Sequence, residues 1–492
     1  MSYSHLPYST SLALLTDFYQ LTMAYAYWSS GKKDLRAAFH LFFRENPFHG
    51  GYTVAAGLEQ VIDFLTHFHF SREDLDYLGS VEGNDGKPVF NQEFLDYLGD
   101  LKFSCDIYAV EEGRVVFPHE PLIRVEGPII QAQLLETTLL NLVNFPTLVA
   151  TKAARVVHAA GTDPVLEFGL RRSQGIDGSL TASRAAYLGG CVATSNVLAG
   201  KRYSIPVKGT HAHSWVMAFD DELEAFRAYA RTMPNNAVFL VDTYSTMVGI
   251  EKAIQVGREL KKTGHKLIGI RLDSGDLADL SIRARKILDQ AGFQDVKVFA
   301  SNDLDESLIQ SLKSQGAEIE VWGVGTRLVT AYDQPALGGV YKLSCIGHED
   351  GVWQPKIKIS EQSLKISNPG IQQVRRFFDK KSAVADMIYD LSRPLGETAI
   401  LVDPLDMTRQ KKLSAELEYE DLLVPIFQNG KQVYKVPSLE ESRNKLQLDL
   451  SRFSTGVKRF ANPHWYPVGL EKSLFDLKTE LILKSRERQT GT

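Results

Sequence analysis

The sequence has little cysteine: three residues of this type, Cys105, Cys191 and Cys345, are spread over 492 positions. No two of them form a Cys-x-x-Cys pair, which argues against a cysteine-rich zinc site and against a disulfide framework. Scarce and scattered cysteine is typical of proteins of the reducing cytosol. We therefore expect a cytoplasmic protein.

Long hydrophobic runs and an excess of basic residues are also missing. No run of about 18 apolar residues occurs, so we expect no transmembrane helix. The first residues show no basic region before a long apolar core, so we expect no signal peptide. The 60 acidic and 55 basic residues give a net charge of −5. Because nucleic-acid binders are usually basic, we expect neither nucleic acid nor membrane as a partner, although this balance is compatible with a local site for a small anion.

The composition is that of an ordinary globular protein, with 44% hydrophobic and 23% charged residues. Short apolar runs recur after about residue 160, and helical patterns over 247–263, 278–292 and 304–315 separate several of them. The runs are VLEF (165–168), IPVKG (205–209), VFLVD (238–242), LIGIRLD (267–273), VKVFA (296–300) and IEVWGVG (319–325). Strands that alternate with helices form a parallel sheet. We predict an α/β fold with an irregular, incomplete TIM-like barrel.

The two ends of the chain show different patterns. Apolar residues at helical spacing predict helices over 12–30, 53–80, 131–160, 439–453 and 469–485. Short strands and turns are expected over 104–130 and again after about residue 340, with Asn429-Gly430 as the turn of a β-hairpin. We predict an N-terminal α+β domain (1–140), an α/β barrel domain with the active site (141–345) and a C-terminal strand-and-helix region packed on both (346–492).

Polar and small residues follow the predicted barrel strands. The carboxyl ends of parallel strands meet on one face of a barrel, which is where such barrels carry their chemistry. In RLDSGD (271–276), two carboxylates lie three residues apart, so they could hold Mg²⁺ or accept hydrogen bonds from sugar hydroxyls. The alternative is a helix cap, for which Asp276 is the better candidate.

Two further strand ends are compatible with anion chemistry. The bare backbone of GVGT (323–326) could cradle a phosphate, or it is simply a close-packed turn; Leu328 and Arg327 stand where a dinucleotide fingerprint and a Walker loop would need Gly and Lys. The pair Arg171-Arg172 suits a phosphate or carboxylate, or it makes surface ion pairs. Without further information, Phe168 is expected to be a core aromatic and Tyr19 an aromatic residue on a helix face.

Two histidines, His211 and His213, stand at positions i and i+2 of the GTHAHSW segment. On one strand they would share a face and could bind a metal, but no third histidine or cysteine is close in sequence. A single histidine that acts as acid, base or phosphate acceptor is better supported. The alternative is a hydrogen-bonded structural histidine.

Taken in order, these segments resemble the nicotinate phosphoribosyltransferases over most of the chain. The similar segments are LLTDFYQLTMAYAYW (14–28), NFPTLVATKAARV (144–156), FGLRRSQGIDGSLTAS (168–183), YLGGCVATSNVLAG (187–200), GTHAHSW (209–215), VDTYST (241–246), IRLDSGDL (270–277), GVGTRLVT (323–330), LGGVYKL (337–343) and NPHWYPVGL (462–470). The resemblance implies the irregular barrel and strand-rich domain of the type II phosphoribosyltransferases. It also implies the reaction of nicotinate with 5-phosphoribosyl 1-pyrophosphate, coupled to ATP hydrolysis, in NAD salvage.

The resemblance also implies roles for particular residues. His213 matches the histidine that ATP phosphorylates, Asp242 a carboxylate near that histidine and the Mg²⁺ ion, and Asp273 a residue that contacts ribose hydroxyls or Mg²⁺. Phe168 and Tyr19 would sandwich the pyridine ring, with Tyr19 supplied by the second subunit of a homodimer. The implied substrate-binding residues are Tyr19, Phe168, Arg171, Ser195, Ser214, Arg271, Ser301, Asn302, Gly323, Gly325 and Thr326. Of these, Arg171 and Arg271 would hold the nicotinate carboxylate and a phosphate, in an order left open, and Gly325 and Thr326 the 5′-phosphate.

Three alternatives were weighed against this function. The nicotinamide phosphoribosyltransferases use an aspartate to accept the amide, where this chain has Ser195, and an aspartate would repel the nicotinate carboxylate. A barrel that binds sugar phosphates without turnover would not need His213, Asp242 and Asp273 together. The quinolinate phosphoribosyltransferases are much shorter and use extra basic residues for a second carboxylate. We therefore favour nicotinate as the substrate.

Overall fold

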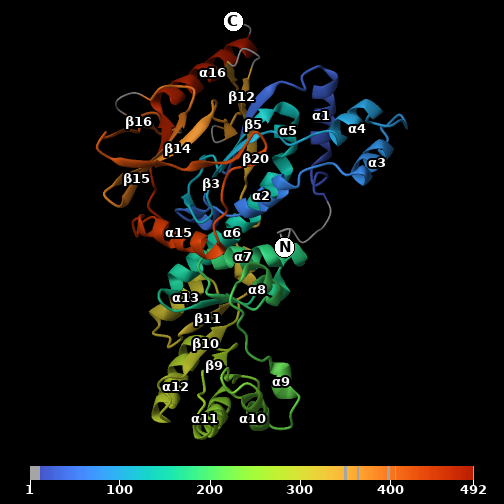
Figure 1. The fold of residues 1–492 in the computed structure, drawn as a ribbon. Helices are drawn as coiled ribbons and strands as arrows, with labels where there is room; N and C mark the ends of the chain where they lie inside the picture. Colours follow the sequence, from blue (N-terminus) through green and yellow to red (C-terminus); the bar gives the residue numbers. More distant parts are fainter. Residues whose placement is uncertain (1–10, 348–351, 363–364, 396–398, 405, 491–492) are drawn as a thin grey trace. The chain divides into compact units, whose positions relative to one another are not determined.

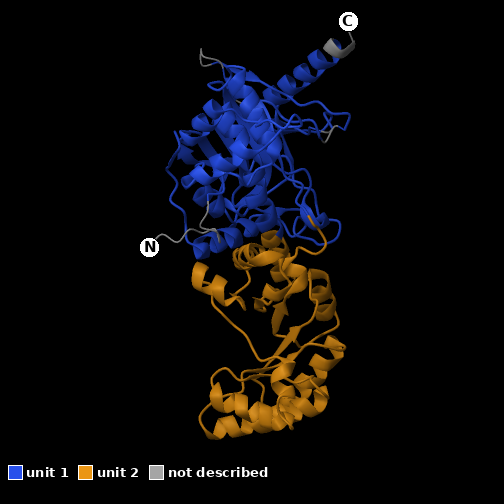
Figure 2. Cartoon of the chain, turned by 90° about the vertical axis from the view of Figure 1, so that its right-hand side faces the viewer, with its two compact units in different colours: residues 1–148, 336–492 blue, residues 149–335 orange. Residues whose placement is uncertain are grey.

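A computed structural model describes residues 11–347, 352–362, 365–395, 399–404 and 406–490. The chain divides into two compact units, which Figure 2 shows in different colours. The barrel unit comprises residues 149–335, inside the predicted middle segment. The terminal unit comprises residues 1–148 and 336–492 and so takes in both predicted outer segments. No described helix is long and apolar enough to span a membrane.

The barrel unit is built on a six-stranded parallel sheet with strand order β7-β6-β11-β10-β9-β8. The strands are β6 (Val165–Glu167), β7 (Ala193–Thr194), β8 (Val238–Leu240), β9 (Gly269–Leu272), β10 (Lys297–Ser301) and β11 (Val321–Val324). The helices around them are the last part of α6 (Glu136–Ala160), η2 (Leu170–Arg172), α7 (Gly175–Leu188), α8 (Val197–Tyr203), α9 (His213–Met217), α10 (Glu222–Thr232), α11 (Thr246–Lys262), α12 (Leu277–Gln290), α13 (Glu306–Ser314) and α14 (Thr326–Val329) (Figure 1). The sheet ends at β7 and β8, so the predicted incomplete barrel is confirmed.

The predicted strands and helices of this unit agree with the structure except near residue 205. The run at 205–209 forms only an isolated parallel bridge between Val207 and Thr194. The two-residue strand β7 takes its place at the edge of the sheet, and it is too short to leave a pattern in the sequence. Helices α12 and α13 begin at Asp276 and Asp305, whose carboxylates accept hydrogen bonds from backbone N–H groups of the first turn.

The terminal unit contains two larger sheets with their helices, together with the two-stranded pair β2-β4. An antiparallel seven-stranded sheet has the order β13-β12-β1-β5-β3-β19-β20, and a mixed six-stranded sheet has the order β17-β16-β21-β15-β14-β18. The first part of the unit contains α1 (Phe18–Ser29), β1 (Arg36–Phe42), η1 (Pro47–His49), β2 (Thr53–Val54), α2 (Leu58–Thr66), α3 (Arg72–Ser80), α4 (Gln92–Gly99), β3 (Asp106–Val110), β4 (Val115–Val116), β5 (Ile123–Pro128) and α5 (Ile129–Leu134). The second part contains β12 (Val340–Gly347), β13 (Trp353–Pro355), β14 (Gln372–Asp379), β15 (Ser382–Asp390), β16 (Ala399–Val402), β17 (Gln410–Leu413), β18 (Glu418–Asp421), β19 (Leu423–Gln428), β20 (Lys431–Gln432), α15 (Leu439–Ser451), β21 (Val468–Glu471) and α16 (Lys472–Thr490).

The largest difference from the sequence prediction in this unit is the segment 53–80, which is not one helical stretch. It forms β2, α2 and α3. Gly57, in the left-handed region with φ of +102°, precedes α2, and a Cβ at this position would lie 2.2 Å from the carbonyl oxygen of Leu142. Ser71 caps the start of α3. The predicted hairpin turn at Asn429-Gly430 is confirmed, with φ values of +47° and +72° between β19 and β20.

Candidate active site

A pocket of about 510 Å³ lies at the carboxyl ends of the barrel strands. Its lining comes from loops and helix starts that follow β6, β7, β9, β10 and β11, together with the loop before α9. The lining residues are Phe168, Arg171, Arg172, Ser195, Gly209, Thr210, His211, Ala212, His213, Arg271, Asp273, Ser301, Asn302, Asp303, Gly323, Gly325 and Thr326. The fold thus gathers predicted residues that are up to 158 positions apart, because parallel strands place their carboxyl ends at one edge.

The carboxylate of Asp242 is connected to the backbone of Asp273 at this edge. Oδ2 of Asp242 accepts hydrogen bonds from the backbone N–H of Asp273 and from the hydroxyl of Ser274, each at 2.8 Å. Oδ1 of Asp242 is buried and has no hydrogen-bond partner. A buried carboxylate oxygen without a protein partner is open to a further donor or a cation.

Asp273 is held on its other side by Ser301 and Arg271. The Ser301 hydroxyl donates to Oδ1 of Asp273, and Nη1 of Arg271 lies 3.3 Å from the same oxygen. Nη1 of Arg271 also donates to the Ser301 hydroxyl at 3.1 Å, and Nη2 donates to the carbonyl of His211 at 2.9 Å. Burial lowers the pKa of the Arg271 guanidinium, but arginine remains charged at neutral pH. Arg271 is therefore a fixed positive charge in the pocket wall.

His213 is the first residue of α9, and its ring lies between the carboxylate of Asp273 and the hydroxyl of Thr243. Its Nδ1 lies 3.1 Å from the hydroxyl of Thr243, and its Nε2 lies 3.7 Å from Oδ2 of Asp273. The side chain is 40% exposed, so a substrate can reach it. A carboxylate beside one ring nitrogen and a hydroxyl beside the other orient the imidazole for nucleophilic or acid–base work.

His211 has a different environment from His213. Its Nε2 accepts a hydrogen bond from the backbone N–H of Leu240 at 3.3 Å, and Tyr229 and Phe226 pack near its ring. Burial lowers the pKa of His211 to about 4, so the ring is neutral at pH 7. The two histidines do not form a metal pair, and within the described residues no group of three or more His, Cys, Asp or Glu side chains could hold a metal ion.

The remaining walls consist of an aromatic ring, arginines and bare backbone. A Cβ at Gly323 would lie 2.9 Å from the ring of Phe168, so glycine is required for the ring to pack there. Asn302 has a φ of +110° and Asp303 one of +20°, conformations that side chains rarely adopt. Backbone strain of this kind clusters at functional sites. Arg171 is exposed at the rim, with Nη1 at 3.4 Å from the carbonyl of Phe168.

Three of the predicted site residues do not line the pocket. Asp242 acts behind it, through its hydrogen bond to Asp273, and Ser214 follows His213 in α9. Tyr19 belongs to the terminal unit, where it is 47% exposed on α1, and burial followed by the charge of Glu136 raises the pKa of its phenol. Sequence reasoning missed Thr243 and Ser274 as partners, although both stand in the strand-end segments that it singled out.

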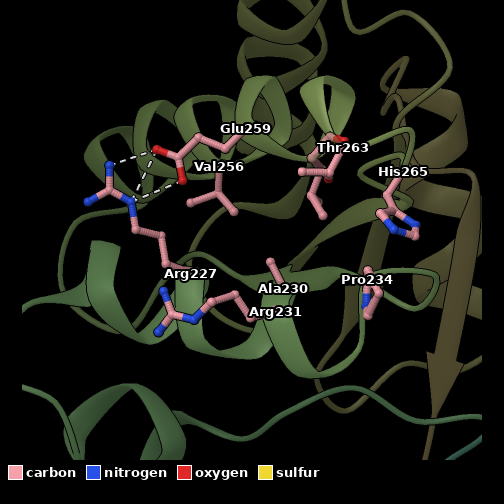
Figure 3. A pocket seen from close by; sticks show the side chains of 9 residues that line it. Arg227, Ala230, Arg231, Pro234, Val256, Glu259, Thr263 and His265 are labelled. Carbon is pink, nitrogen blue, oxygen red and sulfur yellow. Dashed lines mark hydrogen bonds and ion pairs between the residues drawn. The ribbon is translucent and has the colours of Figure 1, made fainter.

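A second pocket in the barrel unit, of about 410 Å³, lies between α10 and α11 (Figure 3). Arg227 and Glu259 face each other across it, with a hydrogen bond of 2.7 Å between Nη2 and Oε1. The lining residues Pro234 and His265 precede β8 and β9 in sequence. This pocket is therefore at the amino ends of the strands, where barrels carry stability rather than chemistry.

Comparisons with known proteins show to which family the chain belongs. The profile of the "Nicotinate phosphoribosyltransferase (NAPRTase) family" matches residues 164–381, and profiles of the N-terminal and C-terminal domains of nicotinate phosphoribosyltransferase match residues 14–144 and 371–478. The chain is 45% identical to nicotinate phosphoribosyltransferase from Bacillus subtilis, over 97% of this chain and 96% of the relative. It is 36% identical to the human enzyme of that name, over 95% and 96%. The crystal structure of human nicotinic acid phosphoribosyltransferase superposes with a TM-score of 0.82 at 34% identity, covering 95% of this chain and 99% of the other. The chain therefore belongs to the nicotinate phosphoribosyltransferase family.

Proposed function

We propose that the pocket at the carboxyl edge of the barrel joins nicotinate to 5-phosphoribosyl 1-pyrophosphate. The products are nicotinate mononucleotide and pyrophosphate, and ATP hydrolysis is coupled to the reaction. One observation carries the proposal: His213, the carboxylate of Asp273 and the buried Arg271 converge on one pocket that also has a bare glycine turn, and Asp242 supports the Asp273 backbone from behind. This combination suits a substrate that bears a phosphate, a diphosphate and sugar hydroxyls.

Each substrate has a wall suited to its chemistry. The flat pyridine ring is proposed to stack on Phe168, with Ser195 nearby and the nicotinate carboxylate on an arginine, Arg171 or Arg271. Ser301, Asn302 and the turn from Gly323 to Thr326 are proposed to hold the phosphoribosyl group. The pyridine nitrogen attacks the anomeric carbon while the bond from that carbon to pyrophosphate breaks. Asp273 is proposed to lie beside the ribose, where positive charge develops, and this would favour the step.

The donor set also fits a magnesium ion. Mg²⁺ prefers oxygen ligands and is usually held by one or two carboxylates together with substrate phosphates. The unpartnered buried Oδ1 of Asp242 and the carboxylate of Asp273 are the proposed ligands. When bound, Mg²⁺ would neutralise charge on the departing pyrophosphate.

ATP is proposed to transfer its terminal phosphate to a ring nitrogen of His213, which releases ADP. Hydrolysis of the phosphohistidine would then drive the main reaction forward. The exposed ring between Thr243 and Asp273 supports this role.

The direct test is an activity assay on the purified full-length chain. We expect nicotinate, phosphoribosyl pyrophosphate and Mg²⁺ to give nicotinate mononucleotide, with ADP rising in step when ATP is present. Both products are followed by chromatography, and nicotinamide replaces nicotinate in a parallel reaction. Comparable turnover of nicotinamide would favour the rival substrate instead. If neither base gives a product, the proposed activity fails, and the result favours the alternative that the barrel binds sugar phosphates without turnover.

We further propose that the chain forms a homodimer in which Tyr19 reaches the site of the other subunit. Two exposed apolar surfaces support this proposal. Within the barrel unit, Leu170, Ile176, Val197 and Leu198 are 42–71% exposed on η2, α7 and α8, which pack on one another. On α1, Phe18, Tyr19 and Met23 are 39–49% exposed. Monomeric proteins rarely expose large contiguous apolar patches, and such patches mark interaction sites.

The substitution Val197→Asp tests the dimer. Light scattering should give the wild type twice the chain mass of 54.9 kDa, and the variant should shift towards the monomer, because burial of an unpaired charge in an interface is costly. Ile282→Asp, at a 43% exposed position on α12, is the matched control and should stay dimeric. A wild type that is monomeric and fully active at high dilution would refute the dimer.

A further inference from the structure

Glu167 is a buried carboxylate directly behind the pocket, and the proposed chemistry does not use it. It is the last residue of β6 and is 1% exposed. The next residue is Phe168, the aromatic wall of the pocket. A buried carboxylate is expensive unless its oxygens are well satisfied. Its partners therefore indicate why this strand ends in a glutamate.

The carboxylate connects two separate segments of the pocket wall. Oε1 accepts the backbone N–H of Gly169. Oε2 accepts the hydroxyl of Ser183 on α7 at 2.8 Å and also the hydroxyl of Thr194 at the end of β7. All three donors are neutral. The Glu167 side chain thus binds the turn after Phe168 through Oε1 and the end of β7 through Oε2.

The segment after β7 is held to the same residue by further bonds. The backbone N–H of Ser195 donates to the carbonyl of Glu167 at 2.9 Å. The hydroxyl of Thr194, which donates to Glu167, accepts the backbone N–H of Asn196 at 2.9 Å. Asn196 in turn caps α8 through its side chain. The position of Ser195 in the pocket wall therefore depends on Glu167 and Thr194.

From these contacts we infer that Glu167 is a positioning residue that sets the spacing between the Phe168 wall and the Ser195 wall. This inference rests on the proposed function, in which the pyridine ring stacks on Phe168 with Ser195 nearby. The phosphoribosyl side of the pocket is built on β10 and β11. Strand β11 pairs with β6 through backbone hydrogen bonds, whereas the partners of the Glu167 carboxylate are Gly169, Ser183 and Thr194. Loss of the connection should therefore weaken the nicotinate subsite selectively.

The test is a pair of conservative substitutions, Glu167→Gln and Thr194→Val. In Glu167→Gln the amide NH₂ replaces one of the two carboxylate oxygens, so it faces either the Gly169 N–H or the hydroxyls of Ser183 and Thr194. The groups that face the NH₂ lose their hydrogen-bond acceptor. We expect the KM for nicotinate to rise about tenfold or more, since an error of 1 Å in placing a reactant can cost about 10²-fold. The KM for phosphoribosyl pyrophosphate should change less than about threefold. Thr194→Val should give the same pattern, and the double variant should be little worse than either single one.

A matched control separates positioning from general stability. Glu306 is another buried carboxylate of the barrel unit, 3% exposed and paired with Lys152 and Arg155 on α6. Glu306→Gln should lower the melting temperature without changing the ratio of the two KM values. Equal rises of both KM values in Glu167→Gln, an unchanged nicotinate KM, or additive effects with Thr194→Val would each overturn the inference.

A readout without substrate keeps this test separate from the test of function. Amide hydrogen exchange over residues 192–197 should accelerate in both Glu167→Gln and Thr194→Val, and it should be unchanged in Glu306→Gln. If the wild type turns over no nicotinate, the proposed function fails while the exchange result still reports on the connection. If exchange over this segment is unchanged in a folded Glu167→Gln, the positioning role fails whatever the activity.

Discussion

Replacing His213 by asparagine should uncouple ATP from the main reaction. The variant should lose ATP-dependent formation of ADP by about 10³-fold or more, because asparagine offers no nucleophilic nitrogen. Formation of nicotinate mononucleotide without ATP should stay within about tenfold of the wild type, since His213 is proposed to act on ATP and not on the pyridine. Nucleotide products are measured with and without ATP in the same reaction mixture. Labelled phosphate on the chain, retained after denaturation in alkali, should be present in the wild type and absent in the variant.

His211→Asn provides the matched control for this prediction. The ring of His211 accepts the Leu240 N–H and packs among aromatic side chains. Its replacement should therefore lower the melting temperature while ADP and mononucleotide remain in the wild-type ratio. Sustained ATP-dependent stimulation in His213→Asn would show that the histidine is not the phosphate acceptor.

Replacing Asp273 by asparagine should have a different signature, because both reactions should fall together. Its carboxylate lies between Ser301, Arg271 and His213, and its backbone N–H donates to Asp242. Asparagine keeps the shape and one acceptor oxygen but removes the negative charge from the place where positive charge is proposed to develop on the ribose. Removal of one electrostatic contact to a transition state typically costs about 10²–10³-fold. We expect a fall of that size in kcat/KM for phosphoribosyl pyrophosphate, with and without ATP.

Asp276→Asn, three residues further along the same loop, is the control for Asp273→Asn. Asp276 caps α12 by accepting the N–H groups of Ala278 and Asp279. Asparagine caps helices about as well as aspartate, so activity and melting temperature should both be nearly unchanged. Equal losses in the two variants would mean that the loop, and not the Asp273 carboxylate, is what the reaction needs.

Asp273 and Asp276 also show which contacts a sequence pattern can predict and which it cannot. The motif RLDSGD places two carboxylates at a predicted strand end, and local pattern favours Asp276 as the helix cap, which the structure confirms. This motif does not indicate that Asp273 contacts Asp242, because Asp242 lies 31 residues away from Asp273 in the sequence. The hydrogen bond between them depends on the pairing of β8 with β9. Such a contact is non-local, so spacing along the chain does not encode it.

The sequence alone was enough to predict the alternation of strands and helices, because apolar periodicity is a local property that burial on a sheet or a helix face imposes. It also determined which residues stand at strand ends, and the resemblance of these segments was enough to indicate the family. The folded structure was needed to show what each residue contacts. It separated the buried, neutral His211 from the exposed His213, replaced the expected strand at 205–209 by β7, and connected Glu167 to Thr194. These outcomes depend on burial and on hydrogen bonds between distant segments, which exist only after the strands have come together.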